Sequence, residues 1–254
     1  MWNEEELLVK YDTSQFEQDL NELGIQLQKR QICQFLKYFE LLVEWNSFMN
    51  LTGITEFDEV MKKHFTDSLS VYPVLLQLQK DYSFKINSLI DVGTGAGFPG
   101  LPLKIFFPEI EVTLLDSLNK RIHFLDTVID ELELSGIHTV HGRAEDFAKP
   151  GKLRSQFDLC VSRAVANLST LSEYCIPFCC QGGFFISYKS EKVSEEMKSG
   201  EKAVTLLGGS VVEKKEFILP NSDIGRTFII IQKRKETPKK FPRKAGLPSK
   251  EPLC

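Results

Sequence analysis

The sequence predicts an α/β fold of the Rossmann-like kind, with a mostly parallel seven-stranded sheet and a helical extension before it. Three observations predict it. Apolar residues recur at helical spacing in the first 80 or so residues. From about residue 86, short apolar runs alternate with amphipathic stretches. A glycine-rich turn follows the first of these runs. Alternating strands and helices are typical of a parallel sheet with helices on both faces.

The N-terminal part, residues 1–85, is expected to form the helical extension. Ile32, Leu36, Phe39 and Val43 repeat at the spacing of one helix face. The run at 50–53 ends in a glycine, which predicts the end of that helix. A second helical stretch is expected over about 56–78.

The central part, residues 86–233, is expected to form the sheet domain. Candidate strands are 88–92, 112–116, 138–141, 157–162, 183–188, 210–217 and 227–232. Candidate helices are 101–107, 120–134, 168–180 and 191–207. Only the short link 219–226 joins the last two strands, so they are expected to pair as an antiparallel hairpin at the sheet edge.

The glycine-rich turn at 91–100 predicts a ligand site. It reads Asp-Val-Gly-Thr-Gly-Ala-Gly-Phe-Pro-Gly, and Gly93, Gly95 and Gly97 allow a sharp turn and a close approach of backbone to ligand. In open α/β sheets, ligands bind at the carboxyl ends of the strands. The next strand ends in Asp116, a carboxylate suited to accepting hydrogen bonds from two ribose hydroxyls. Together these features predict a nucleoside-containing cofactor.

Two cofactors fit this turn. Residues 95–100 match the dinucleotide fingerprint G-x-G-x-x-G, so a nicotinamide-dependent oxidoreductase is one alternative. Asp91 lies two residues before Gly93, however, as is common in S-adenosylmethionine enzymes. Phe98 and Pro99 would crowd a pyrophosphate at the start of the helix. We therefore favour S-adenosylmethionine; a tight turn that holds no ligand is the remaining alternative.

The charge is distributed unevenly. Lys and Arg number 31 against 35 Asp and Glu, a net charge of −4. From Gln232 onward there are eight Lys and Arg and two Glu, so this end of the chain carries +6 and the remainder −10. A basic tail, residues 234–254, on an acidic body suggests a polyanionic partner.

The composition is that of a soluble globular protein, with 42% hydrophobic and 26% charged residues. The start of the chain is acidic and lacks an apolar core, so we expect no secretory signal and a cytoplasmic location. No apolar run is long enough to cross a membrane. The six cysteines lack zinc-ligand spacing, so we expect no metal and interpret them as small core residues.

Several motifs in one order resemble the RsmG (GidB) family, the bacterial 16S rRNA guanine-N7 methyltransferases, which have the class I methyltransferase fold. The resemblance covers nearly the whole chain. Its motifs are 45–46 (Trp-Asn), 50–52 (Asn-Leu-Thr), 64–69 (His-Phe-Thr-Asp-Ser-Leu), 91–100, 116–121 (Asp-Ser-Leu-Asn-Lys-Arg), 143–145 (Arg-Ala-Glu), 162–165 (Ser-Arg-Ala-Val), 207–209 (Leu-Gly-Gly) and 237–244 (Thr-Pro-Lys-Lys-Phe-Pro-Arg-Lys).

The resemblance implies methylation at N7 of one guanine in 16S rRNA, near the decoding centre. It also implies cofactor contacts at Gly93, Phe98, Ala144, Glu145 and Arg163. Guanine N7 has a free lone pair and no proton to lose, so we assign no catalytic acid, base or nucleophile. A non-enzymatic RNA-binding protein on the same fold is a further alternative, which the intact cofactor motif disfavours.

Three polar residues outside the turn are open to more than one interpretation. Arg163 is expected to order the cofactor end of the pocket or to contact RNA phosphate; a structural ion pair is the alternative. His64 and Asp67 lie three residues apart and could share a helix face as an acid–base pair. We favour a packing or capping role for both, because N7 chemistry moves no proton.

The basic tail is expected to bind RNA through Lys239, Lys240, Arg243 and Lys244. A solvated, disordered end is the alternative. Pro238, Phe241 and Pro242 lie among the cations and suggest a stiffer, anchored segment. We expect the tail to stand apart from the cofactor pocket; the competing view is a tail that packs over the pocket, with Phe241 as its anchor.

Overall fold

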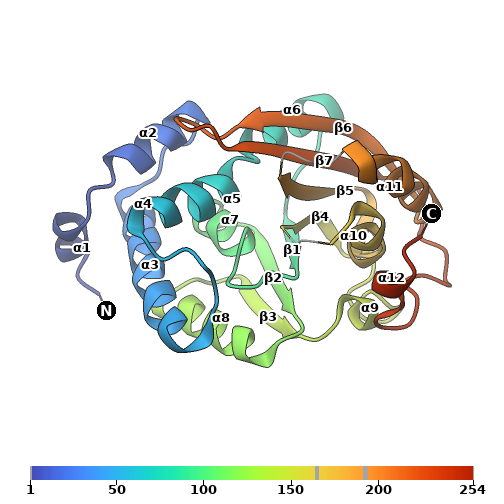
Figure 1. Ribbon diagram of the computed structural model, residues 1–254, viewed down its shortest axis with the longest axis horizontal. Coiled ribbons are helices and arrows are strands. Elements are labelled where there is room, and N and C mark those ends of the chain that lie inside the picture. Colours follow the sequence, from blue (N-terminus) through green and yellow to red (C-terminus); the bar gives the residue numbers. More distant parts are fainter. Residues whose placement is uncertain (1, 164–165, 191–193, 254) are drawn as a thin grey trace.

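A computed structural model describes residues 2–163, 166–190 and 194–253. Seven strands form one sheet in the order β3-β2-β1-β4-β5-β7-β6 (Figure 1). The strands are β1 (Ser88–Val92), β2 (Glu111–Asp116), β3 (Ile137–His141), β4 (Phe157–Ser162), β5 (Cys179–Ser190), β6 (Gly209–Ile218) and β7 (Gly225–Lys233). The first five are parallel, while β7 is antiparallel to both β5 and β6. The predicted α/β fold with a mostly parallel seven-stranded sheet is confirmed.

Helices cover both faces of the sheet. The N-terminal ones are α1 (Glu4–Lys10), α2 (Ser14–Glu22), α3 (Lys29–Met49), α4 (Phe57–Val60), η1 (Met61–Thr66), α5 (Asp67–Leu69) and α6 (Tyr72–Tyr82). Between and after the strands lie α7 (Gly100–Phe106), α8 (Asn119–Glu131), α9 (Ala144–Phe147), α10 (Leu168–Cys175), η2 (Ile176–Phe178), α11 (Ser194–Leu206) and α12 (Leu247–Lys250). No helix within the described residues is long and apolar enough to cross a membrane.

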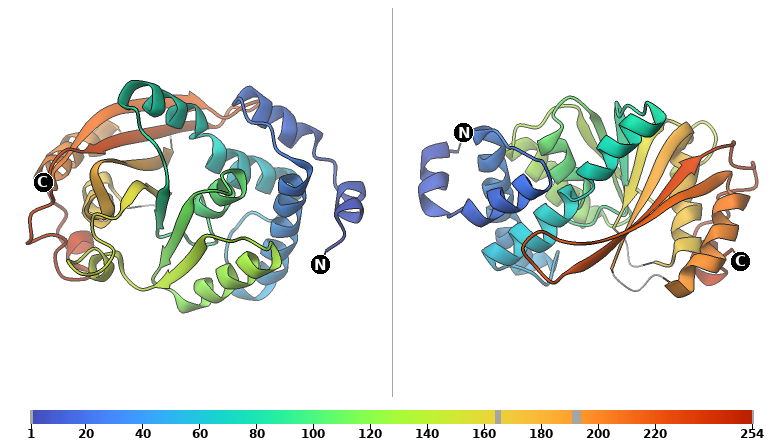
Figure 2. Two further views of the ribbon diagram at one scale, coloured as in Figure 1. Left: turned by 180° about the vertical axis from the view of Figure 1, so that it is seen from behind. Right: turned by 90° about the horizontal axis from the view of Figure 1, so that it is seen from above.

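The predicted hairpin is confirmed at the sheet edge. Strands β6 and β7 pair antiparallel, and their connection reaches the N-terminal helices (Figure 2, right). There the Asn221 side chain donates to Asp19 (3.0 Å), and the Lys62 ammonium donates to the Pro220 carbonyl (2.6 Å) and forms an ion pair with Asp19. The hairpin therefore joins the last strands of the sheet to the first helices of the chain.

One predicted helix is too long. The sequence pattern predicts a single helix over 168–180, but α10 ends at Cys175. Pro177 lies in the short η2 turn that follows, where it has no N–H to continue an α-helix. Cys179 then begins β5. Of the predicted helix 191–207, residues 191–193 lie outside the described part of the chain, and α11 covers 194–206.

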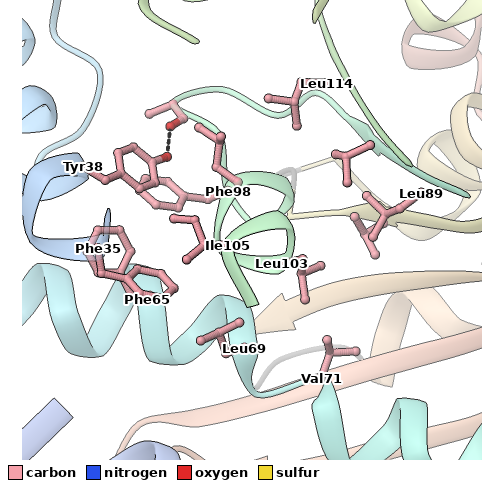
Figure 3. Close-up of a cluster of buried hydrophobic side chains, with 14 of the residues drawn as sticks. Phe35, Tyr38, Phe65, Leu69, Val71, Leu89, Phe98, Leu103, Ile105 and Leu114 are labelled. Carbon is pink, nitrogen blue, oxygen red and sulfur yellow. Dashed lines mark hydrogen bonds between the residues drawn. The ribbon is translucent and has the colours of Figure 1, made fainter. Parts of the chain in front are cut away.

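Side chains that alternate along the strands pack into two hydrophobic cores, one on each face of the sheet. In β7, Phe228 and Ile230 join the core beneath the N-terminal helices, α7 and α8, while Ile229 and Ile231 join the core beneath α10 and α11. The expected division between residues 85 and 86 falls between α6 and β1. Side chains on both sides of it share one core, which contains Phe35 and Phe65 of the helices together with Leu103 and Leu114 (Figure 3).

Tyr38 ties this core to the glycine-rich turn. Its ring is fully buried in α3 and stacks on Phe98 with ring centroids 5.4 Å apart. Its hydroxyl donates a hydrogen bond to the backbone carbonyl of Ala96 (Figure 3). Because this carbonyl lies inside the turn, α3 supports the loop from behind.

We predict that Tyr38→Phe destabilises the protein by about 1–3 kcal/mol, because it leaves the Ala96 carbonyl without its donor. Urea unfolding at neutral pH measures the change. Tyr82→Phe is the control, since Tyr82 is exposed at the end of α6 and should give a change near zero. Equal stabilities of the two variants would contradict a supporting role for the Tyr38 hydroxyl.

Candidate cofactor site

The glycine-rich turn adopts a backbone that only glycine takes easily. Gly93, Gly95 and Gly97 have φ of 72°, 64° and 99°, in the left-handed region. A Cβ at Gly97 would lie 2.4 Å from a Leu101 methyl and 2.5 Å from the Tyr38 hydroxyl. At Gly95 no atom lies within 4 Å of such a Cβ, so this part of the turn faces open space.

Asp91 holds the turn together from beneath. Its carboxylate is fully buried at the end of β1, and Oδ2 accepts hydrogen bonds from the Thr94 hydroxyl (2.7 Å) and the Gly100 N–H (2.8 Å). Oδ1 has no partner among the described residues. Burial raises the pKa of Asp91 to about 6, against the two hydrogen bonds, which lower it.

A cavity of about 310 Å³ opens at the carboxyl ends of the parallel strands. Its lining comes from the ends of β1, β2 and β3, from α8, the start of α9 and α10, and from the loop before α10. These residues are Val92, Gly93, Leu115, Asp116, Ser117, Arg121, Gly142, Arg143, Ala144, Glu145, Ala166, Leu171 and Tyr174. The location agrees with the rule for ligands of open α/β sheets.

Asp116 forms one wall of this cavity and is itself nearly buried. Oδ2 accepts from the Gly95 N–H (2.9 Å) and lies 3.3 Å from the Arg121 guanidinium. Oδ1 accepts from the Leu118 N–H (2.9 Å). Asp116 therefore ties the second strand to the glycine turn across the mouth of the cavity.

The basic tail reaches the cavity wall, contrary to our expectation that it stands apart. The Gly246 N–H donates to the buried Glu145 carboxylate (2.8 Å). Phe241 is buried in the core beneath α10, as the competing view required. In Figure 1, α12 lies beside α9 and α10. The tail is therefore anchored in the body of the protein and contributes a backbone donor to one wall of the cavity.

Arg243 is engaged by the body of the protein. Its guanidinium and backbone N–H donate to Glu173, a fully buried carboxylate of α10, over 2.7–3.1 Å. Lys239, Lys240 and Lys244 are exposed. The four tail cations that we grouped together thus lie in two different environments.

The remaining predicted cofactor residues also divide into two groups. Gly93, Asp116, Ala144 and Glu145 line the cavity, and Gly95 adjoins it through Asp116. Gly97 and Phe98 of the turn, and Arg163, are not among the described residues that form the cavity wall. Residues 164–165 of the Ser-Arg-Ala-Val motif lie outside the described residues.

A cluster of polar groups supports the turn from behind. Arg163 donates to the Asp67 carboxylate (3.0 Å) and the Lys63 carbonyl (3.2 Å), and its guanidinium lies 5.0 Å from the centre of the Phe98 ring. The other Asp67 oxygen accepts from Arg226 (2.9 Å). Arg163 therefore has the ion pair that we gave as its alternative interpretation, and Asp67 holds two arginines.

His64 links this cluster to Phe98. The two rings stack with centroids 4.6 Å apart and planes 15° apart. Nδ1 lies 3.3 Å from the Arg163 guanidinium, and Nε2 lies 2.8 Å from the Thr52 hydroxyl. Burial, together with the positive charge of Arg163, lowers the pKa of His64 to about 3. His64 is therefore neutral at physiological pH, and Nδ1 can accept from Arg163.

The sequence did not reveal that α10 and the tail contribute to the site. Leu171 and Tyr174 of α10 line the cavity, and Gly246 of the tail contacts its wall. Glu173, next to Tyr174 in an otherwise uncharged helix, was the available signal, because a carboxylate on a buried helix is stabilised by a cationic partner. Among the described residues, no cluster of three or more His, Cys, Asp or Glu could hold a metal ion.

We predict that His64 makes stability fall with acid. Its folded pKa, about 3, lies below its ordinary value of 6.5, so its contribution is complete above pH 6.5 and is lost as pH falls toward 3. When the pH is lowered from about 7.5 to about 5, the free energy of unfolding of the unchanged protein should fall by about 2 kcal/mol more than that of His64→Gln.

Urea unfolding of both proteins at the two pH values measures this difference. The comparison with the variant is needed because the raised pKa of Asp91 acts in the opposite direction: stability that depends on Asp91 increases as pH falls through about 6. Equal losses in the two proteins would show that His64 is not held neutral by its surroundings.

The family model and the sequence relatives that match this chain carry the same description. The family model described as rRNA small subunit methyltransferase G matches residues 31–223. A protein named ribosomal RNA small subunit methyltransferase G from Lachnoclostridium phytofermentans is 54% identical over 95% of this chain and 98% of its own length. One from Lactococcus lactis subsp. lactis is 50% identical over 92% of this chain and 96% of its own.

Solved structures resemble the chain more remotely. A 16S rRNA N2 G1207 methyltransferase of T. Thermophilus, solved with AdoMet and guanosine, covers 65% of this chain and 40% of its own, with 21% identity and a TM-score of 0.42. A putative methyltransferase in complex with the Haloferax volcanii Trm112 activator covers 68% of this chain and 99% of its own, with 12% identity and a TM-score of 0.48. The assignment therefore rests on the sequence relatives, and by the family model and their identity over nearly its whole length the chain belongs to the rRNA small subunit methyltransferase G family.

Proposed function

We propose that this protein transfers a methyl group from S-adenosylmethionine to N7 of a guanine in 16S rRNA near the decoding centre. The observation that carries the proposal is the cavity at the ends of β1, β2 and β3, which holds the buried carboxylates of Asp116 and Glu145 beside a glycine turn. The base and its place in the ribosome follow from the family resemblance. An rRNA substrate makes the cytoplasm the expected location.

The residues present fit S-adenosylmethionine. Asp91 Oδ1 is a buried acceptor next to the turn, without a partner among the described residues, which suits the ammonium group of the methionine part. Asp116 presents its carboxylate to the cavity and suits the ribose hydroxyls. Ala144 and Glu145 lie at the far wall, where we infer the adenine. When bound, this cofactor supplies a methyl group activated by a sulfonium.

The chain's own role is then binding and orientation. Attack by N7 is an in-line displacement that needs positioning and no general base. His64 is neutral and forms hydrogen bonds within its cluster, and Arg163 is paired with Asp67. Neither group is placed to move a proton on the substrate, so we assign both to support of the turn through Phe98.

The nicotinamide alternative meets an electrostatic obstacle. A pyrophosphate at the glycine turn would have to bind the free N–H groups at the start of α7. The Gly100 N–H already donates to the Asp91 carboxylate, which is buried 2.8 Å away. A second anion at this position would be repelled by the first. S-adenosylmethionine instead brings an ammonium group and a sulfonium, whose positive charges suit a buried carboxylate.

For the RNA, we infer a contact through the exposed tail cations Lys239, Lys240 and Lys244. They lie on the same tail segment whose backbone reaches Glu145, so phosphates bound there would lie near the cavity. Lys240 stays close to the anchored part of the tail, with its ammonium 5.2 Å from the Phe241 ring centre. We leave Arg243 out of this group, because it binds Glu173.

We predict that Asp116→Ala weakens S-adenosylmethionine binding about 10- to 100-fold, as expected when a charge-assisted hydrogen bond of about 1.5–3 kcal/mol is removed. Calorimetry on the purified proteins measures the dissociation constant. Asp126→Ala, on the exposed face of α8, is the matched control and should bind normally. An unchanged constant for a folded Asp116→Ala would exclude this carboxylate from the cofactor site.

We predict that replacing Lys239, Lys240 and Lys244 together by Ala weakens RNA binding and flattens its salt dependence. The slope should fall by about 0.7–0.9 for each phosphate that the variant no longer neutralises. S-adenosylmethionine affinity should stay the same. Filter binding to a 16S rRNA fragment at several salt concentrations measures the slope. Alanine at the exposed Lys29, Lys80 and Lys85 removes the same charge elsewhere; if it lowers the slope equally, the tail is not the RNA contact.

A further inference from the structure

We propose that Arg243 is a positioning residue for the cofactor cavity: paired with Glu173, it holds residues 243–251 as a strap that keeps Glu145 and α10 in place at the cavity wall. The inference rests on the proposed cofactor. It assigns to one cation of the basic tail a role that differs from RNA binding, and it makes the tail part of the cofactor site.

The first step is the ion pair. Glu173 is fully buried in α10, and Arg243 supplies hydrogen bonds from its backbone N–H (2.7 Å), Nε (3.0 Å) and terminal NH₂ (2.7 Å). The two hydrogen bonds from the guanidinium form a bidentate pair with the carboxylate, which fixes direction as well as distance. Without Arg243, a buried carboxylate would be left uncompensated, which is strongly unfavourable. The pair therefore fixes where the tail leaves the core and turns toward the cavity.

The second step is the path of the strap. The Arg243 guanidinium also donates to the Glu251 carbonyl (2.7 Å), which closes the segment on itself. The Thr170 hydroxyl of α10 donates to the Pro248 carbonyl (3.1 Å). Between Arg243 and Pro248, the Gly246 N–H donates to the Glu145 carboxylate (2.8 Å). Gly246 takes a φ of 82°, the left-handed backbone that turns its N–H toward that carboxylate.

The third step is that one helix, α10, both lines the cavity and holds the strap. In α10, Leu171 and Tyr174 line the cavity, whereas Thr170 and Glu173 hold the strap. Because these residues are adjacent along the helix, a shift of α10 that follows release of the strap must move the cavity wall. Glu145, which lines the same cavity from α9, would at the same time be left without its backbone donor.

The test uses Arg243→Gln and Arg243→Lys in the full chain. With Arg243→Gln we expect S-adenosylmethionine to bind at least tenfold more weakly, and KM for the cofactor to rise with kcat nearly unchanged, because the strap acts on binding of the cofactor and not on the reacting atoms. Arg243→Lys restores the charge but not the paired geometry, so it should recover part of the affinity.

The control is Lys235→Ala, which removes another exposed cation of the tail and should leave cofactor affinity unchanged. All measurements are made well below the melting temperature of each variant, so that a reduced affinity reports on the cavity. A folded Arg243→Gln with normal cofactor affinity, or a Lys235→Ala that binds the cofactor as weakly as Arg243→Gln, would overturn the proposal.

A second variant covers the case in which Arg243→Gln does not fold. Ending the chain after Lys244 keeps the pair with Glu173 and removes Gly246 and α12. It should also weaken cofactor binding at least tenfold, and normal binding by this folded variant would overturn the proposal. If the unchanged protein binds no S-adenosylmethionine at all, the proposed function fails. If it binds and the variants bind equally well, the inference about the strap alone fails.

Discussion

The buried carboxylate of Asp91 fixes the turn between β1 and α7, and the candidate site is arranged around that turn. One oxygen of Asp91 draws together the Thr94 hydroxyl and the N–H that begins α7, which brings the two ends of the turn close. Tyr38 then supports the turn from α3, and Asp116 holds it from β2. Because all three contacts are made to one short segment, the cavity depends on the relative positions of the N-terminal helices and the sheet.

Two buried carboxylates of this protein, Asp67 and Glu173, are paired with arginines, and the buried His64 is held neutral. Asp67 binds two arginines, one that follows β4 and one at the start of β7, and Glu173 binds Arg243. His64, which lies beside one of these arginines, is kept uncharged, because burial and then repulsion from the Arg163 guanidinium lower its pKa. The acidic body and the basic tail are therefore joined by a specific buried ion pair as well as by their general opposite charge.

The sequence predicted what local patterns determine. Strand and helix alternation, the hairpin and the glycine turn depend on residues close together in the chain, and these predictions agree with the sheet order. It could not predict contacts between residues far apart. Arg243 and Glu173 are 70 residues apart, and Gly246 and Glu145 are 101 apart. Local charge alone made the tail look like a separate RNA-binding segment. The end of α10 was missed for another reason, since an apolar run continues from that helix into β5 without a polar break.

The connection between β6 and β7 has a consequence for how the chain is made. Asn221 contacts Asp19 across 202 residues of sequence, and Lys62 bonds to the carbonyl of Pro220. While the ribosome is still synthesising the chain, the first helices emerge long before the hairpin that they bind. Contacts of such separation form late, because the intervening chain must first be ordered. During synthesis, the N-terminal helices therefore remain without the hairpin, with the Asp19 and Lys62 side chains uncovered, until nearly the whole protein has left the exit tunnel.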